Sequence, residues 1–209
     1  MSIFSSVKVR AQRRSKFDLS HAKKLSFNMG DLIPVLVQDV VPGDSFRGST
    51  EILLRFAPML APIMHRVNVY THFFFVPNRL VWSSWEDFIT GGEDGLQAPV
   101  SPFMLFTNTN KAQAQDGTLP DYMGVPEVSG TVTQNLQVSS IPFRAYHLIA
   151  NEYYRDQNLT AEVDIDKDSS GQEGATVQGN LVDIRKRCWE KDYFTSALPW
   201  TQRGAEAEV

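Results

Sequence analysis

The stretch that most limits the possible folds is HFFFVPNRLVWSSWEDF, residues His72–Phe88, where bulky apolar side chains crowd around a single proline. The segment that leads into it, Arg66–Val76, begins with polar side chains on one face and ends apolar on both faces. This pattern predicts a strand that runs from a partly wet surface into an interior covered on both sides. Pro77 cannot donate to a strand ladder, so the strand is expected to end there.

A short amphipathic helix is expected directly after the proline. Asn78 is a favourable N-cap residue. The apolar residues Val81, Trp85 and Phe88 then follow at helical spacing. A glycine pair that starts at Gly91 ends the element. The stretch is therefore interpreted as a strand, a sharp turn and a helix that packs back on its own strand.

Other parts of the chain carry weaker patterns. Ile33–Val41 is β-branched and apolar up to a Pro-Gly-Asp turn, which predicts a strand, and Glu51–Phe56 is a shorter extended candidate. Pro142–Asp156 has proline in its first turn and an apolar stripe, which predicts a second helix. Residues 91–140 lack sustained periodicity and predict a long connection that is functional or forms an interaction surface. Ala161–Asn180 is polar and predicts a surface loop.

The large side chains of these elements are interpreted as structural and not as reactive groups. They recur on one face of each predicted helix, and on the apolar part of the predicted strand, as core residues do. The residues assigned to the core are Phe73, Phe75, Val81, Trp85, Phe88, Phe143, Tyr146 and Tyr153.

Charge is distributed unevenly along the chain. The net charge is −4, but residues 1–24 contain seven basic residues and one acidic residue, which leaves −10 on the rest. A basic arm on an acidic body is typical of proteins that touch nucleic acid or another acidic surface, although a solvated terminus has the same composition. The candidate residues for contact with nucleic acid or an inner shell surface are Lys8, Arg10, Arg13, Arg14, Lys16, Lys23 and Lys24.

The sequence carries no catalytic or cofactor-binding signature. The Walker pattern, the dinucleotide glycine fingerprint and the Gly-x-Ser-x-Gly elbow are all absent. The sequence has no run of 18 apolar residues, so no membrane-spanning helix and no membrane partner are expected. The N-terminus lacks the apolar core of a secretory signal, and the single cysteine fits a reducing compartment. The chain is therefore not expected to be an enzyme, and no cofactor is expected.

The histidines and the cysteine give no convincing site. His65 and His72 are separated by an odd number of positions, so on a continuous strand they lie on opposite faces and make a poor metal pair. His147 has Asn151 and not an acid at the next turn of its helix, which favours a structural histidine. Cys188 has no evident base partner and is expected to be buried.

One acidic run resembles the start of a calcium loop. Asp164, Asp166 and Asp168 stand at alternate positions. Ser169 stands where that loop needs glycine, however, and Ala175 stands where it needs a bidentate glutamate. A solvated acidic loop is favoured over a calcium site, and no metal is assigned.

Five blocks of the sequence carry a resemblance. In order along the chain they are Phe17–Phe46 (FDLSHAKKLSFNMGDLIPVLVQDVVPGDSF), Ala61–Gly92 (APIMHRVNVYTHFFFVPNRLVWSSWEDFITGG), Leu119–Pro126 (LPDYMGVP), Ile141–Leu159 (IPFRAYHLIANEYYRDQNL) and Lys191–Gly204 (KDYFTSALPWTQRG). Together they resemble the N-terminal part of the major capsid protein of the Microviridae, small single-stranded DNA phages, and of the gokushovirus branch in particular.

The resemblance implies a mainly β fold, a viral jelly roll with long loops between its strands and two or more short helices. Ile33–Val41 and Arg66–Val76 would be early strands. Residues 1–30 would form a basic arm and residues 31–209 a partial jelly-roll domain with an insertion at about 91–140. Because members of the family are much longer, the chain is expected to cover only part of the barrel, which predicts poor solubility in isolation.

The resemblance also implies a function. Family members are structural virion proteins that assemble in the host bacterial cytoplasm into a T=1 icosahedral capsid of about sixty identical copies. Their partners are other capsid subunits, the single-stranded DNA genome, a small basic DNA-packaging protein and other virion proteins. One alternative is a single-stranded nucleic-acid-binding module that acts through the basic arm. A jelly-roll enzyme or lectin of the cupin type would need a His/Glu metal cluster, which His65 and His72 do not offer.

Overall fold

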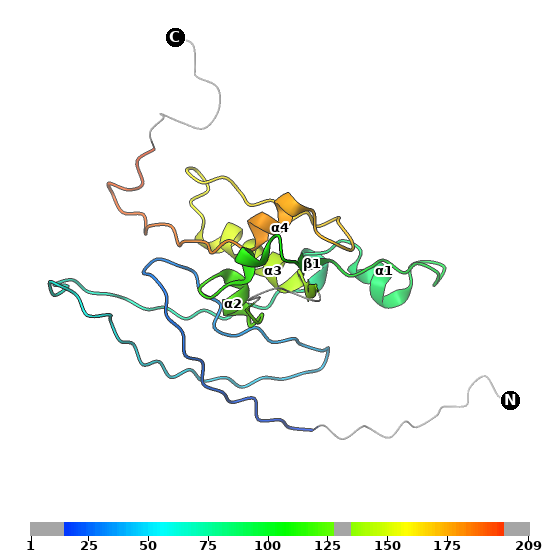
Figure 1. Ribbon diagram of the computed structural model, residues 1–209, viewed down its shortest axis with the longest axis horizontal. Coiled ribbons are helices and arrows are strands. Elements are labelled where there is room, and N and C mark those ends of the chain that lie inside the picture. Colours follow the sequence, from blue (N-terminus) through cyan, green and yellow to red (C-terminus); the bar gives the residue numbers. More distant parts are fainter. Residues whose placement is uncertain (1–14, 128–134, 199–209) are drawn as a thin grey trace, which may run out of the picture.

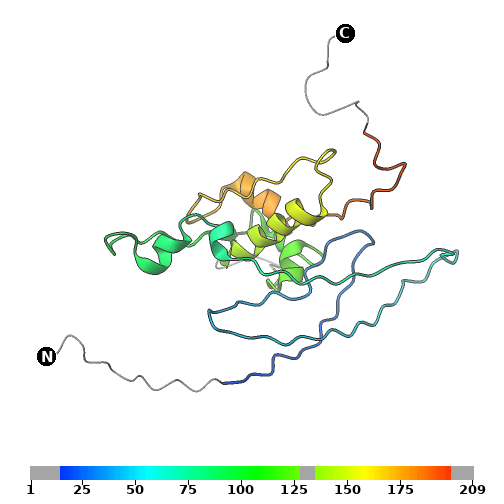
Figure 2. The ribbon, with the colours of Figure 1, turned by 180° about the vertical axis from the view of Figure 1, so that it is seen from behind.

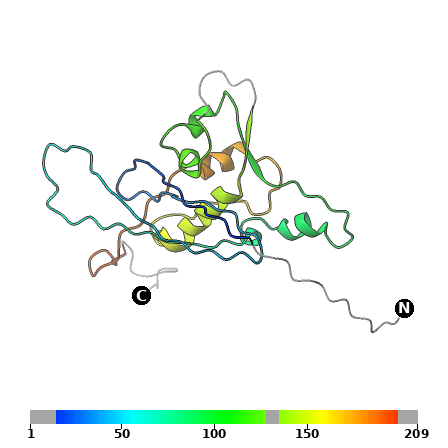
Figure 3. The same ribbon diagram turned by 90° about the horizontal axis from the view of Figure 1, so that it is seen from below.

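The computed structural model describes residues 15–127 and 135–198, which form short helices, two short strands and long irregular stretches (Figure 1). In chain order the elements are the 3-10 helix η1 (Asn78–Leu80), α1 (Trp85–Thr90), β1 (Phe103–Phe106), the 3-10 helix η2 (Lys111–Ala114), α2 (Leu119–Met123), β2 (Leu136–Ser139), α3 (Ile141–Ile149), the π-helix η3 (Ala150–Tyr154) and α4 (Ala175–Leu181). Residues 32–76 contain no helix and no paired strand. Figures 2 and 3 show them, in blue to cyan, as open loops beside the helices.

A small antiparallel sheet organises the folded part. β1 pairs with β2 in a register that places Phe103 opposite Ser139 and Phe106 opposite Leu136. Exposure alternates along β1, and Met104 and Phe106 point into the core while their neighbours are half-buried. Gln172 forms a parallel bridge to Phe103, so the chain before α4 lies beside the first residue of β1.

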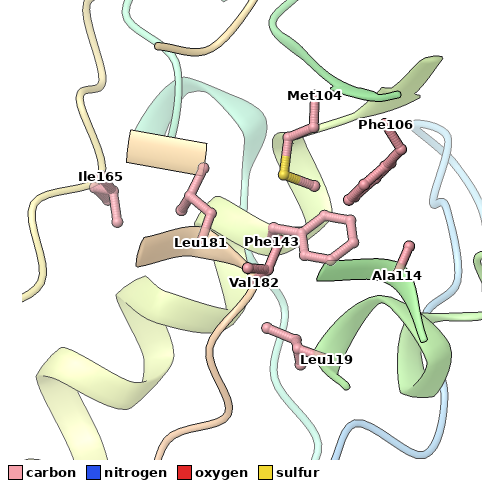
Figure 4. Packing of buried hydrophobic residues seen from close by; sticks show 8 residues of the cluster. All are labelled: Met104, Phe106, Ala114, Leu119, Phe143, Ile165, Leu181 and Val182. Atoms are coloured by element: carbon pink, nitrogen blue, oxygen red, sulfur yellow. The ribbon is translucent and has the colours of Figure 1, made fainter. Parts of the chain in front are cut away.

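The apolar core lies between this sheet, α2, α3 and α4. Phe143 of α3 lies at the centre of the cluster, between Met104 and Phe106 on one side and Leu181 and Val182 on the other (Figure 4). The full set of buried cluster residues is Met104, Phe106, Ala114, Leu119, Phe143, Ile165, Leu181 and Val182. Each fully buried large apolar side chain stabilises the fold by about 1.5–3 kcal/mol, so this cluster is the main source of stability in the described residues.

A buried ion pair crosses the same region. Arg144 of α3 and Glu173 have fully buried side chains, and Nη2 of the arginine lies 2.7 Å from Oε1 of the glutamate. Arg144 also donates to the carbonyl of Val81 and to the hydroxyl of Ser169, and the Ser140 hydroxyl donates to Glu173. Both charges are therefore surrounded by hydrogen-bonding partners, as burial of charge requires.

His147 is a structural histidine, as the sequence suggested. Its ring is completely buried; Nε2 lies 3.1 Å from the carbonyl oxygen of Leu181, and Nδ1 lies 3.3 Å from Nε of Arg185. Burial, together with the neighbouring guanidinium, lowers the pKa of His147 to about 4. Nearby, burial raises the pKa of the Tyr146 phenol to about 12.

The predicted strands are not formed in the described residues. Ile33–Val41, Glu51–Phe56 and Arg66–Val76 contain no ladder hydrogen bonds, and the structure does not confirm the mainly β class or the jelly roll. The physical reason is that an extended segment becomes a strand only when a neighbouring strand takes up its N–H and C=O groups.

The predicted helices are found with altered bounds. The second is confirmed as α3 continued by η3. The first is divided into two helices, η1 and α1. Asn78 is the first residue of η1 and not its N-cap, and Ser84 is the N-cap of α1. The C-terminal glycine is confirmed, because Gly91 has a φ of 84° and its N–H donates to the carbonyl of Asp87.

Two segments expected to be connections contribute to the core. Residues 91–140 contain β1, η2, α2 and β2 and supply half of the buried cluster. Ala161–Asn180, expected to be a surface loop, contains buried Ile165 and most of α4. These elements are only four to seven residues long, too short for a periodic pattern to develop in the sequence.

Half of the residues assigned to the core are exposed in the described structure. Val81 and Phe143 are buried, and Trp85 and Tyr146 are half-buried. The exposed members are Phe73 (72% exposed), Phe75 (75%), Phe88 (46%) and Tyr153 (69%). They do not belong to the core of this chain because no described segment covers them.

We predict that Glu173→Gln lowers the free energy of unfolding by about 3–5 kcal/mol, because it leaves the buried Arg144 charge without its counter-charge. Urea denaturation followed by tryptophan fluorescence measures the effect. Glu190→Gln is the matched control, since its pair with Arg187 is exposed and should contribute little. Equal effects of the two substitutions would contradict the structural role assigned to the buried pair.

The free energy of unfolding should also decrease as the pH is lowered, because His147 is buried in its neutral form. Below pH 6.5 the unfolded chain binds a proton that the folded histidine accepts only near pH 4. The free energy of unfolding should therefore drop by about 2 kcal/mol between pH 6.5 and about pH 5. Denaturation of the wild type and His147→Gln at both pH values measures this, and the substitution should flatten the dependence. A pH slope that survives in the variant would assign the effect to other groups.

Candidate interaction surface

The open segment, residues 33–76, is the most unusual surface of the described chain. Its large apolar side chains are exposed on both faces of an extended backbone, as with Phe73 and Phe75 on one face and Phe74, 38% exposed, on the other. The exposed apolar residues between 33 and 69 are Val35, Leu36, Val37, Val40, Val41, Phe46, Ile52, Leu53, Leu54, Phe56, Met59, Leu60, Ile63, Met64, Val67 and Val69. Contiguous exposed apolar surface of this extent is typical of an interface.

Residues 54–69 of the open segment fold back on themselves and form a shallow apolar groove. Its walls are Leu54, Phe56, Met59, Ile63, Val67 and Val69. Of the described residues that line the groove, His65 alone has a polar side chain that could act chemically. The groove is therefore suited to packing against apolar side chains, not to binding a polar small molecule.

Both ends of the open segment are fixed to the core. Just before it, the N–H of Leu32 donates to the carbonyl of Arg185 at 2.8 Å, and the Tyr146 hydroxyl donates to the carbonyl of Leu32 at 2.9 Å. Just after it, Trp82 is fully buried, and its Nε1 donates to the Ser170 hydroxyl. The core thus holds the two ends while the middle meets solvent.

A second cluster, which the sequence patterns did not reveal, lies at the end of the open segment. We call it the aromatic row: Tyr70, His72, Phe74, Tyr153 and Tyr154. His72 stacks on Tyr154 with ring centroids 5.8 Å apart and an interplanar angle of 14°, and its Nδ1 hydrogen-bonds the Tyr154 hydroxyl. The sequence does show rings at alternate positions 70, 72 and 74. That pattern alone does not indicate a cluster, because the contacts of Phe74 with Tyr153 and Tyr154 of η3 are seen only in the structure.

The structure describes only part of the predicted basic arm. Lys8, Arg10, Arg13 and Arg14 lie outside the described residues. Lys16 and Lys24 are exposed and available for contact with an anion.

Lys23 has a different environment from the other described lysines of the arm. It donates to the carbonyls of Tyr122 and Pro34, and burial lowers its pKa. This lysine holds the arm against α2, so of the three described lysines of the arm it is the one least available to nucleic acid.

No metal site or membrane-spanning helix emerges within the part of the chain that the structure describes. No three His, Cys, Asp or Glu side chains lie together in a way that could hold a metal ion, and no helix is long and apolar enough to cross a bilayer. In the acidic run, the side chain of Asp164 accepts from the backbone N–H of Asp166. Cys188 is partly buried, and its N–H donates to the carbonyl of Tyr154.

Comparison with known proteins gives consistent matches. Residues 5–209 match a protein family described as capsid protein (F protein). The chain is similar to capsid protein VP1 of Chlamydia phage 1 at 39% identity over 99% of its length, and to VP1 of Bdellovibrio phage phiMH2K at 36% over 94%. It is similar to VP1 of Spiroplasma virus 4 at 34% over 97%. It spans between 35% and 37% of the length of these relatives.

We predict that Phe73→Ser combined with Phe75→Ser raises the solubility of the chain and changes its free energy of unfolding by no more than about 0.5 kcal/mol per site. The reason is that both rings are already exposed. Ultracentrifugation and urea denaturation provide the two measurements. Phe143→Ala is the matched control and should cost about 3–5 kcal/mol. A comparable loss in the double variant would show that the two rings are buried in the folded chain.

Proposed function

This chain belongs to the phage capsid protein (F protein) family, and on that premise we propose that it forms part of the structural subunit of a phage shell. The observation that carries the proposal is the open segment, whose apolar side chains face solvent on both sides of an extended backbone. A coat subunit buries such surface against further strands and against its neighbours. The role is structural and not enzymatic.

The open segment supports a jelly roll as the complete fold. Ile33–Val41 and Arg66–Val76 have strand-like composition and unpaired backbones, so each is suited to enter a sheet whose other strands come from elsewhere in the capsid polypeptide. Under this proposal residues 31–209 are a partial jelly-roll domain, and residues 91–140 are an insertion that shares its small core with α3 and α4.

The proposed assembly is a T=1 icosahedral shell of about sixty copies around a single-stranded DNA genome, formed in the host bacterial cytoplasm. Other capsid subunits are the first partners. The basic arm, residues 1–30, would face the genome on the inner side, together with a small basic DNA-packaging protein and other virion proteins. A nucleic-acid-binding module that acts through the arm alone is not favoured, because the family match extends over residues 5–209.

The test is assembly in a chimera. Replacing the matched part of VP1 of Chlamydia phage 1 by this chain should give shells that sediment as large particles and are visible by electron microscopy. The same chimera with Phe73→Ser and Phe75→Ser should form particles poorly, since the strand loses the side chains that it would bury against the other strands and against neighbouring subunits.

The control for the chimera is its near-ultraviolet circular dichroism, which reports the packed core separately from assembly. A soluble chimera with a packed core that never forms particles would contradict the proposed function. Equal particle yields with and without the two phenylalanines would contradict the assignment of the open segment as the surface that assembly buries.

A further inference from the structure

The aromatic row presents a series of rings on one side of the open segment. The rings of Tyr70, His72 and Phe74 lie on the same face of the extended backbone, with successive centroids 6.3 and 6.2 Å apart. Tyr153 and Tyr154 of η3 add to them, and the rings of Phe74 and Tyr153 are 4.9 Å apart. Tyr70 and Tyr153, at the two ends, are 56% and 69% exposed, so each offers a ring to solvent.

A guanidinium extends the row at one end. The Arg187 side chain lies over the Tyr70 ring at 5.2 Å from its centroid, and it remains 35% exposed. Arg185 and Lys186 precede it, but Glu190 accepts from Arg187 at 2.6 Å, and Asp183 lies 3.9 Å from Arg185. The charge around the row is therefore mixed, and flat surfaces rather than excess positive charge distinguish it.

Backbone contacts hold the row in place. The N–H of Cys188 donates to the carbonyl of Tyr154 at 2.8 Å, and the N–H of Arg187 donates to the carbonyl of Gly30 at 2.9 Å. The π-helical turn of η3 directs Tyr153 and Tyr154 toward the open segment, and π-helical turns are frequent at functional sites. Rings fixed in this way lose little conformational entropy when a flat ligand stacks on them.

We propose that the aromatic row, with Arg187, is a stacking platform for unpaired bases of a single-stranded nucleic acid. Bases stack on exposed aromatic rings and on arginine planes without regard to sequence. A surface that contacts many different stretches of a single strand needs this tolerance of sequence. The assignment of these residues goes beyond the proposed function and rests on it only for the source of the strand. The phosphates would be neutralised by other basic groups, such as the arm.

The two faces of the open segment divide these tasks. Phe73 and Phe75 carry no polar atom and suit burial against protein. On the opposite face, His72 and Tyr70 carry polar ring atoms that suit a wet, hydrogen-bonding ligand, and Arg187 over the Tyr70 ring adds a second flat surface on which a base can stack. This difference favours a nucleic acid over a protein partner at the row.

The experiment compares two single strands with the full 209-residue chain. Fluorescence anisotropy measures the affinity for a labelled oligothymidine and for an abasic strand of equal length, which has the same phosphates and no bases. The wild type should bind the oligothymidine about tenfold or more tightly than the abasic strand. Tyr70→Leu combined with Tyr153→Leu should remove that difference, and both residues are exposed, so the core should be unaffected.

The matched control is Tyr193→Leu, which removes an 88% exposed tyrosine outside the row and should keep the preference for bases. Equal wild-type affinities for the two strands would overturn the proposal, as would a preference that persists in the double variant. If the two tyrosine substitutions leave the base preference intact but abolish shell formation when placed in the chimera with VP1, the row would be assigned to a protein contact instead. Binding is measured on the unassembled chain, so its outcome is independent of whether the chimera forms shells.

Discussion

The buried pair of Arg144 and Glu173 is the interaction on which the rest of the described fold depends. Its hydrogen bonds join α3, the residues that follow η1 and the chain that enters α4, three regions far apart in the sequence. Because an arginine offers five donors in a fixed plane, it can join several chain segments at once, which a hydrophobic side chain of similar size cannot do. The apolar cluster around Phe143 then packs beside this junction.

This junction also determines how the open segment is presented. Val81, whose carbonyl accepts from Arg144, follows the segment closely, and Leu32, held by Arg185 and Tyr146, precedes it. With both ends held, the segment has fewer conformations to lose when it pairs with other strands. Under the proposed role, the small core would thereby lower the entropic cost of forming a much larger interface.

The sequence predicted the longest helix and missed the short elements, and the long strands that it predicted are not formed in the described residues. The helix at α3 was predictable because proline at its start and an apolar stripe extend over several turns. β1, β2 and α2 were not, since four or five residues cannot display a period. Arg144, His147 and Asn151 do follow helical spacing, but a polar stripe is usually taken as solvated, and only their partners Glu173, Leu181 and Val163 show that this one is buried.

Phe143 and Phe73 show why composition alone could not locate the core. The two side chains are identical, yet one is 1% exposed and the other 72%. The difference lies in the backbone: a helix satisfies its own hydrogen bonds and can pack as soon as it forms, whereas an extended segment needs a neighbouring strand first. In a protein whose strands pair across long sequence separations, the residues with the strongest apolar signal are therefore the last to be buried. The exposure of Phe73 in this chain follows because no described segment pairs with residues 66–76, and the same side chain would be buried in the sheet that we propose.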